Sequence, residues 1–211
     1  MNALAMHSRA LYQDVAELLR QRIFSRELEP GTWIDELRIA QELGISRTPL
    51  REAIKVLAAE GLVTMKLRRG AYVTEVSEQD LREVYHLLAL LEADAASVVA
   101  ASASDEEREE LLGLHDELAH ATGDRDAFFR LNEAFHMRLL TIANNRWRNQ
   151  MVADLRKVMK LNRHSSLFKS GRIAQSLAEH QALVDAIQAR QPDVAAQCMQ
   201  DHFANGLQAA T

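Results

Sequence analysis

Histidines at helical spacing inside apolar stripes are the residues of this chain most able to do chemistry. His136 follows Asn132 by four residues, and the neighbouring Phe and Leu residues share their helical face. His180 lies eleven residues before Gln191, and His202 lies eleven residues after it. An antiparallel helix pair turning at Gln191 would bring both imidazoles to the same height. We therefore expect these polar groups to converge inside one helix bundle.

A divalent metal ion would satisfy all of these polar groups at once. A buried polar group without a partner costs roughly 1–3 kcal/mol, and imidazole nitrogens suit Zn, Ni, Cu or Fe. A single histidine on an apolar face is more often a core residue with a satisfied hydrogen bond, but three together are harder to explain in that way. We therefore predict a metal site with zinc as the expected ion, Ni, Mn or Fe as alternatives, and the ligands Asn132, His136, His180 and His202.

A second group of candidate residues lies at the start of a predicted helix that begins after Ser46. Serine is a favourable N-cap residue. A turn of about 100° per residue places Arg47, Thr48 and Arg51 on one face, opposite the apolar positions. Arginine can bind guanine with two hydrogen bonds, and a helix N-terminus favours a phosphate. This face therefore has the pattern of a DNA recognition helix.

Basic residues also surround a turn between two short β-prone runs. Lys66, Arg68 and Arg69 flank this turn, and Gly70 permits a close approach of the backbone to a ligand. A helix-turn-helix followed by a basic hairpin is typical of a winged helix-turn-helix. We expect the hairpin to contact phosphates or the minor groove of DNA.

The two groups of residues fall in different halves of a mostly α chain. Apolar periodicity predicts three helices and a β-hairpin wing, followed by six amphipathic helices in an antiparallel bundle. The expected domains are a loose tail at residues 1–9, a winged helix-turn-helix DNA-binding domain at 10–76, and an all-helical effector, metal-binding and dimerisation domain at 77–211.

The fourth helix of the bundle, expected over residues 147–164, supplies candidates for binding an effector. Asn162 falls on its inner face, where it could line a pocket. Arg156 and Arg163 lie on the flank of that face, and we expect them to be solvated. His115, in the acidic second helix of the bundle, is expected at the surface.

Charge and composition limit the partners. The 211-residue chain has a net charge of −5, yet residues 46–70 hold six basic and two acidic residues. Such a patch indicates a confined anionic partner, with a solvated helix face as the alternative. No apolar run approaches the ~20 residues of a membrane span, and the N-terminus lacks the long apolar segment of a secretory signal. The single cysteine, Cys198, excludes an internal disulfide and agrees with a cytoplasmic protein.

The stretch PGTWIDELRIAQELGISRTPLREAIKVLAAEGLV, with RRGAYV after it, resembles the DNA-binding domain of the GntR family of bacterial transcription regulators. The resemblance spans about residues 10–76 and is most specific in SRTPLREA and EGLV. It implies operator contacts from Arg47, Thr48, Arg51, Arg69 and Gly70. Leu37 stands where the family often has an arginine, and the adjacent Arg38 could replace that contact.

Residues 77–209 are similar to the FCD effector domain of the FadR branch of this family, in LNEAFH, in AEH and in MQDH. In that branch, an Asp or Asn and three His bind a divalent metal, which in turn holds a small carboxylate effector. The resemblance implies these roles for Asn132, His136, His180 and His202. It also implies a homodimer on a pseudo-palindromic operator. Leu88 stands where many members have an arginine four residues before a glutamate, so a common carboxylate-binding cation is absent there.

Together these features predict a ligand-responsive transcription regulator, expected to be a repressor, and two alternatives stay open. A metal-dependent hydrolase or hydratase would also use three histidines around an open metal. Against it, no Glu or Asp shares the inner helix face with Asn132 and His136, and the DNA-binding half would have no purpose. An architectural DNA-binding protein without an effector would need neither the metal nor a ligand response.

Overall fold

The computed structural model describes residues 11–161 and 171–210. The chain divides into two compact units, residues 1–76 and residues 77–211. We call the described parts of these units the winged unit and the helical unit, and each is considered by itself.

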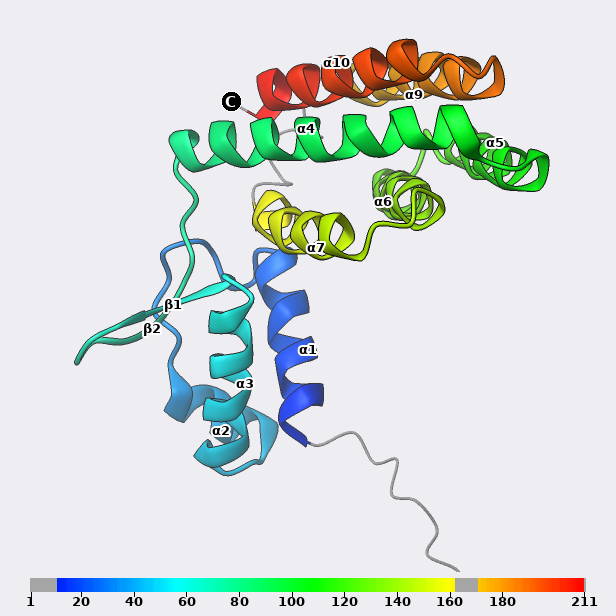
Figure 1. The fold of residues 1–211 in the computed structure, drawn as a ribbon. Coiled ribbons are helices and arrows are strands. Elements are labelled where there is room, and N and C mark those ends of the chain that lie inside the picture. The colour runs from blue at the N-terminus through cyan, green and yellow to red at the C-terminus, as the bar shows by residue number, and fades with distance from the viewer. Residues whose placement is uncertain (1–10, 162–170, 211) are drawn as a thin grey trace, which may run out of the picture. The chain divides into compact units, whose positions relative to one another are not determined.

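The winged unit has three helices and one β-hairpin (Figure 1). Helices α1 and α2 both pack against α3, and the fully buried Leu19, Ile39 and Leu50 lie in the core between them. The two strands pair antiparallel, with Val63 opposite Val73. The elements are α1 (Leu11–Phe24), α2 (Glu36–Leu43), α3 (Arg47–Ala59), β1 (Val63–Lys66) and β2 (Gly70–Val73).

The connection between α2 and α3 is short and determined by its end residues. The Asp35 side chain accepts hydrogen bonds from the first backbone amides of α2, and Gly44 ends that helix in the left-handed conformation, at φ 63°. Ser46 precedes α3 with an extended backbone, but its hydroxyl makes no capping hydrogen bond. The prediction that Ser46 caps α3 is therefore right in position and wrong in the side-chain contact.

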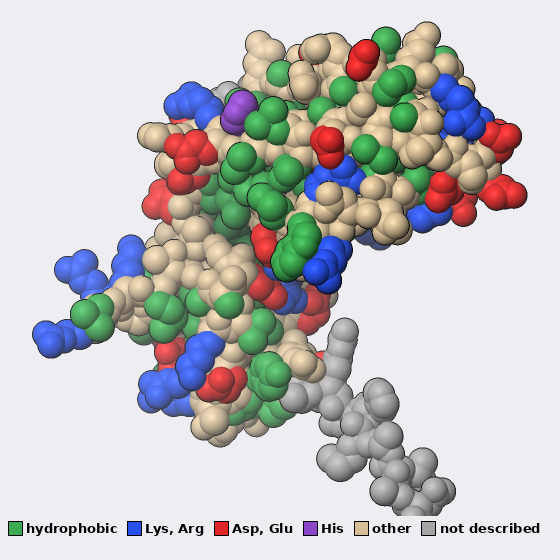
Figure 2. All heavy atoms as spheres, viewed as in Figure 1, with side chains coloured by type: hydrophobic (Ala, Val, Ile, Leu, Met, Phe, Trp, Pro, Cys, Tyr) green, Lys and Arg blue, Asp and Glu red, His purple; other side chains and the backbone are tan. Residues whose placement is uncertain are grey.

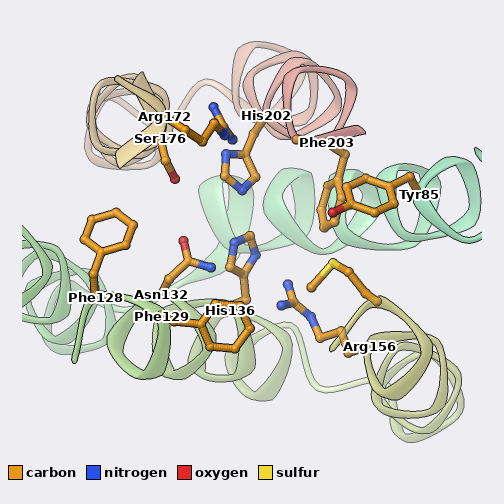
Figure 3. Close-up of a pocket in the computed structure, with 12 residues that line it drawn as sticks. Tyr85, Phe128, Phe129, Asn132, His136, Arg156, Arg172, Ser176, His202 and Phe203 are labelled. Carbon is orange, nitrogen blue, oxygen red and sulfur yellow. The ribbon is translucent and has the colours of Figure 1, made fainter. Parts of the chain in front are cut away.

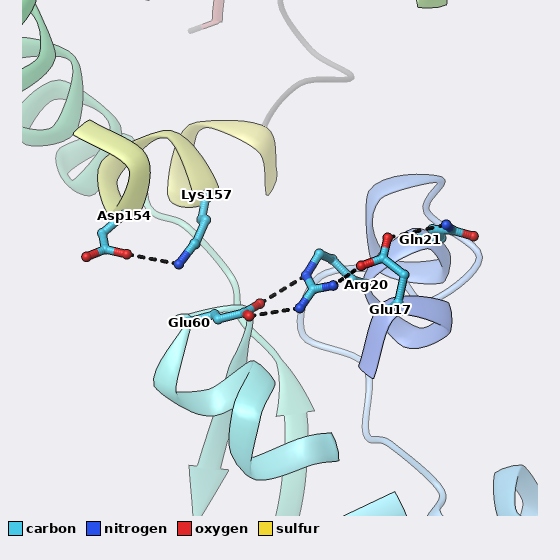
Figure 4. A network of polar contacts seen from close by, with 6 residues as sticks. All are labelled: Glu17, Arg20, Gln21, Glu60, Asp154 and Lys157. Carbon is cyan, nitrogen blue, oxygen red and sulfur yellow. Dashed lines mark hydrogen bonds and ion pairs between the residues drawn. The ribbon is translucent and has the colours of Figure 1, made fainter. Parts of the chain in front are cut away.

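A polar contact fixes the end of α3 against α1. Arg20 donates from Nε and Nη2 to the two carboxylate oxygens of Glu60, at 3.0 and 2.8 Å, and it also pairs with Glu17 (Figure 4). Because both members of this pair are mostly buried, the contact holds α3 at one place on α1. The same figure shows a separate contact within the helical unit, where Lys157 donates to Asp154 at 2.9 Å.

The described part of the helical unit contains six helices, and the long α4 packs against four of the others (Figure 1). Helix α10 lies along both α4 and α9, while α6 and α7 also pack on α4, and α5 packs on α6 and α9. Capping boxes at Ser77 and Ser104 begin α4 and α5, with the side chain of each serine accepting from a backbone amide of its helix. The elements are α4 (Glu78–Ser102), α5 (Asp105–His120), α6 (Arg125–Ile142), α7 (Arg146–Leu161), α9 (Arg172–Gln188) and α10 (Pro192–Ala210).

Helix α4 corrects the expectation that no segment approaches the apolarity of a membrane span. Among the described residues it is the one helix long and apolar enough to cross a membrane by length and composition. Half of its most apolar window is buried, and α4 contacts α6, α7, α9 and α10. Its composition is therefore explained by its place in the core of the bundle.

Candidate functional site

Three of the predicted histidines meet inside the helical unit. His136 comes from α6, His180 from α9 and His202 from α10, and each is buried. One ring nitrogen of each lies within 4.8 Å of the other two. The ring centroids are 4.8 to 5.2 Å apart, and Figure 3 shows His136 and His202 turned toward each other. The structure thus brings together side chains that are as much as 66 residues apart in the sequence.

Carboxylates orient two of the three imidazoles. His136 Nδ1 donates to Glu92 Oε2 at 2.6 Å, and His202 Nδ1 donates to Glu179 Oε2 at 2.8 Å. An imidazole that donates from Nδ1 keeps the lone pair of Nε2 for another partner. Metal-binding histidines usually show this arrangement, with the second nitrogen held by a carboxylate or a carbonyl.

The remaining polar atoms of the cluster lack partners. Both ring nitrogens of His180 and the Oδ1 atom of Asn132 are buried without a hydrogen bond among the described residues. Unsatisfied buried groups of this kind are rare, and each calls for a ligand or an ordered water. The three imidazoles therefore offer the kind of nitrogen donors that a divalent ion such as zinc binds. The side chain of Asn132 lines the cavity beside His136 and His202.

Burial keeps the imidazoles in the neutral form that a metal requires. It lowers the pKa of His136 and of His180 well below the usual histidine range, and the positive charge of Arg156 lowers both further. Metal ions bind deprotonated ligands. At neutral pH these two rings are therefore ready to act as ligands without releasing a proton.

Two arginines complete the polar network and correct the sequence analysis. Arg156, expected to be solvated, is buried and donates to both oxygens of Glu92 at 2.8 Å. Arg172, which the sequence analysis did not name, donates to both oxygens of Glu179 at 2.9 and 3.0 Å. Burial opposes ionisation of Glu179, but the contacts from His202 and Arg172 outweigh it and lower its pKa to about 2. Each chain of contacts runs from a histidine through a carboxylate to an arginine.

Two carboxylates that the sequence analysis did not assign to the site, Glu92 and Glu179, contact His136 and His202. They were missed because they come from α4 and α9, not from the helix that carries those two residues. One signal for Glu92 was present, since it is the lone acid on the otherwise apolar buried stripe of α4. Both oxygens of Glu92 are engaged by His136 and Arg156, which suits holding a ligand in place better than general base catalysis.

His115 is a further correction. It was expected at the surface, but it is buried on α5, with Nε2 2.8 Å from Gln181 Oε1 on α9. Its contact joins two helices of the bundle. His115 does not belong to the group of three histidines whose ring nitrogens converge.

A small cavity of about 70 Å³ opens beside the histidines (Figure 3). Its polar wall combines predicted ligands with the two arginines, and its apolar wall is largely aromatic. Gly206 contributes room, because a Cβ there would lie 3.1 Å from the Tyr85 ring. The lining residues are Tyr85, Phe128, Phe129, Asn132, His136, Arg156, Met159, Arg172, Ser176, His202, Phe203 and Gly206.

The predicted DNA-binding residues lie on the exposed side of α2, α3 and the hairpin. Arg47, Thr48 and Arg51 project from the exposed face of α3, opposite the buried Leu50 and Leu57. Lys and Arg side chains gather over the hairpin and over α3 in Figure 2. The exposed candidates of this face are Arg38, Ser46, Arg47, Thr48, Arg51, Lys66 and Arg69.

Gly70, the first residue of β2, follows the hairpin turn on this surface. Its φ is 91°, a conformation that other residues rarely adopt, and a Cβ there would lie 3.0 Å from Trp33 Nε1. Beside it, the Lys66 ammonium lies 4.4 Å from the centre of the Tyr72 ring. The hairpin thus presents cationic side chains next to a position that only glycine fits easily.

A recognition helix with a basic hairpin, in one chain with an all-helical unit, defines the class of winged helix-turn-helix DNA-binding regulators. Comparisons with known families agree. The profile described as "Bacterial regulatory proteins, gntR family" matches residues 11–73, and that of the FCD domain matches residues 83–205. The chain therefore belongs to the GntR family and carries an FCD domain. It is a sequence-specific DNA-binding transcriptional regulator of this type.

Individual relatives are similar over most of their length. The HTH-type transcriptional regulator YdhC of Bacillus subtilis is 27% identical over 188 residues, covering 88% of this chain and 84% of the relative. The transcriptional repressor RspR of Escherichia coli is 27% identical over 193 residues, covering 90% and 85%. Among solved structures, E. coli McbR/YncC has a TM-score of 0.79 at 20% identity, covering 96% of this chain and 98% of that one. This last likeness shows the fold.

Proposed function

We propose that the helical unit is a sensor that binds a divalent metal and a small organic acid, and that this binding changes the affinity of the chain for its operator. The observation that carries the proposal is the group of three buried imidazoles. Carboxylates orient two of them, and the third has no hydrogen-bond partner among the described residues. Such a group is costly unless a ligand occupies it. The proposed metal ligands are Asn132, His136, His180 and His202, and zinc is the expected ion.

The cavity supports a small acid as the effector. A bound divalent cation would supply positive charge for a carboxylate at the cavity wall. The two arginines at that wall are already paired with glutamates, so most of their charge is balanced before an effector arrives. Leu88, at the place of a common family arginine, is fully buried. Asn162 and Arg163, the other expected effector contacts, lie outside the described residues.

The DNA-binding half of the proposal assigns operator contacts to α3 and to the hairpin. Arg47, Thr48 and Arg51 would contact base edges and phosphates, with Arg38 and Ser46 beside them. Lys66, Arg69 and Gly70 of the hairpin would contact the backbone or the minor groove. Relatives include the E. coli repressor RspR and the gluconate operon transcriptional repressor of Bacillus subtilis, 44% identical over 78 residues. We therefore propose repression by a cytoplasmic protein.

A homodimer on a pseudo-palindromic operator is the proposed assembly. Large apolar side chains are exposed on two adjacent helices, α4 and α7. Figure 2 shows hydrophobic side chains, in green, gathered on one face of the helical unit. Exposed apolar patches usually mark interaction sites. The exposed side chains are Leu87, Leu90, Val98, Trp147 and Met151.

The mechanism we propose is a shift between two arrangements of the dimer. An effector can change DNA affinity only if it binds the two arrangements with unequal affinity. Because the histidine ligands come from α6, α9 and α10, a ligand held among them would favour one relative placement of these helices. The recognition helices of the dimer would follow that placement.

Metal content and thermal stability test the sensor directly. The purified wild type is expected to contain about one divalent ion per chain, and chelation should lower its melting temperature. His180→Ala should abolish the bound metal and leave DNA affinity of the metal-free protein unchanged. His120→Ala, at an exposed histidine, is the matched control. A wild type that neither retains nor takes up Zn, Ni, Mn or Fe would refute the metal site.

A screen of organic acids then tests the effector. An acid that fills the cavity should raise the melting temperature of the metal-loaded wild type but not of His180→Ala. The same acid should change operator binding. If acids stabilise both proteins equally, they bind elsewhere.

A further inference from the structure

Glu36, the first residue of α2, accepts hydrogen bonds from both arginines of the α3 face. Its Oε2 atom lies 2.8 Å from Arg51 Nε and 3.3 Å from Arg47 Nη2. The Glu36 side chain is 19% exposed, whereas the Arg47 and Arg51 side chains are 53% and 56% exposed. One shielded carboxylate therefore holds two arginines that otherwise extend into solvent.

The contacts leave the base-reading atoms accessible. Arg51 uses only Nε toward Glu36, and its two terminal Nη groups make no hydrogen bond or ion pair within the described residues. Arg47 uses a single Nη group. A guanidinium contacts guanine with two parallel N–H groups. The carboxylate thus contacts each guanidinium through one nitrogen and leaves the other N–H groups available for a base.

Holding these side chains in advance favours specific binding. A free arginine loses much rotamer freedom when it docks, and a side chain that is already ordered loses less. The negative charge acts in a second way. Burial would raise the pKa of Glu36, but the contacts from Arg51 and Arg47 outweigh it and keep the pKa below the usual glutamate range. The ionised carboxylate offsets part of the attraction to phosphates, which carries no sequence information.

We propose that Glu36 is a positioning residue that raises operator discrimination by holding Arg47 and Arg51 for base contact and by weakening sequence-independent binding. This inference rests on the assignment of α3 as the recognition helix. A carboxylate at this place also stabilises the N-terminus of α2. A purely structural role of that kind would lower stability without changing sequence preference, and the experiment separates the two roles.

The test compares full-length wild type, Glu36→Gln and Glu52→Gln by selection from a randomised duplex library. Glu52 is a matched control, because it lies on α3, is exposed and pairs with Lys55. Both substitutions remove one negative charge near the DNA-binding face, so both should raise affinity for random-sequence duplex. Only Glu36→Gln should reduce the ratio of selected-site to random-duplex affinity beyond that common effect, by about tenfold, the size of one weakened base contact.

A double-mutant cycle with Arg51 separates the positioning role of Glu36 from a general loss of stability in Glu36→Gln. Arg51→Lys leaves Glu36 in place but removes both the Nε contact and the paired guanidinium N–H groups that contact guanine. This variant should therefore discriminate less between the selected site and random duplex than the wild type does. Adding Glu36→Gln to it should then cost less than Glu36→Gln costs in the wild type. Equal discrimination in wild type and Glu36→Gln would overturn the proposal, as would equal losses in Glu36→Gln and Glu52→Gln. A wild type that selects no sequence would refute the assignment of α3, and the inference with it.

Discussion

At the scale of single residues, the proposed metal site depends on side chains that would not touch the metal. Glu92 and Glu179 each hold Nδ1 of one histidine and thereby determine which nitrogen faces the centre of the cluster. His180 has no such partner among the described residues. The orientation of two ligands is therefore fixed in advance, while that of the third depends on packing against Phe135, whose ring centroid lies 4.8 Å away.

Glu179→Gln tests the role of an orienting carboxylate. Glutamine keeps one acceptor oxygen in place of two and carries no charge, so His202 and Arg172 lose part of their restraint. Metal affinity should fall by roughly 10–100-fold, as is usual for such partners. Competition with a chromophoric chelator measures it. Glu117→Gln, at an exposed position on α5, is the control and should bind metal like the wild type. Equal affinities of all three proteins would show that Glu179 serves only packing.

The sequence predicts the histidines well and their partners poorly, for a physical reason. His136 and Asn132 share a helix face, which periodicity reveals directly. Arg156 was placed in solvent because its position on its own helix is on a flank. It is buried because Glu92, 64 residues away, pairs with it. Whether such a charge is buried depends on a distant partner, and helix periodicity carries no information about that partner.

At the scale of elements, the short α2–α3 connection places the recognition helix. Gly44 ends α2 at φ 63°, and no atom of the described residues lies within 4 Å of where its Cβ would stand. Any effect of a side chain at this position would therefore come from the backbone conformation alone. The next helix starts only three residues later, so strain at Gly44 would act on the start of α3.

A pair of glycine substitutions tests this element, with opposite signs expected. Gly44→Ala should destabilise the protein by roughly 1–2 kcal/mol, because a Cβ is strained in the left-handed conformation. Gly113→Ala, in the interior of α5 and also with no described atom within 4 Å of the new Cβ, should stabilise it by roughly 0.5–1 kcal/mol. Urea denaturation followed by circular dichroism gives both values. A neutral Gly44→Ala would mean that α2 can end in another way.

Most elements could be predicted because their signals are local. Apolar periodicity acts within a few residues, and the helices that it predicts are confirmed. Serine capping boxes at α4 and α5 and the proline at the start of α10 act over the same short range. The exception is the apolar character of α4. Its high hydropathy follows from burial against four other helices, which is a property of the whole bundle.

At the scale of the whole molecule, the proposed function requires two copies. One winged unit offers one recognition helix, and a single half-site contact gives limited affinity and discrimination. Joining two such units makes the second contact intramolecular, which raises affinity without any new contact. The exposed apolar side chains of α4 and α7 are the surface we assign to this association.

Leu90→Glu tests the dimer surface. Leu90 is 50% exposed on α4, so a glutamate there should fold normally, but two copies of it near a twofold axis would bury unpaired charges. Sedimentation should change from dimer to monomer, and affinity for a two-half-site duplex should fall by about 10²-fold or more, while affinity for a single half-site stays unchanged. Val194→Glu places the same charge on α10, at a residue 47% exposed, and should leave the dimer intact. If both variants remain dimers, association uses another face. If both become monomers, the effect comes from net charge and not from the surface formed by α4 and α7.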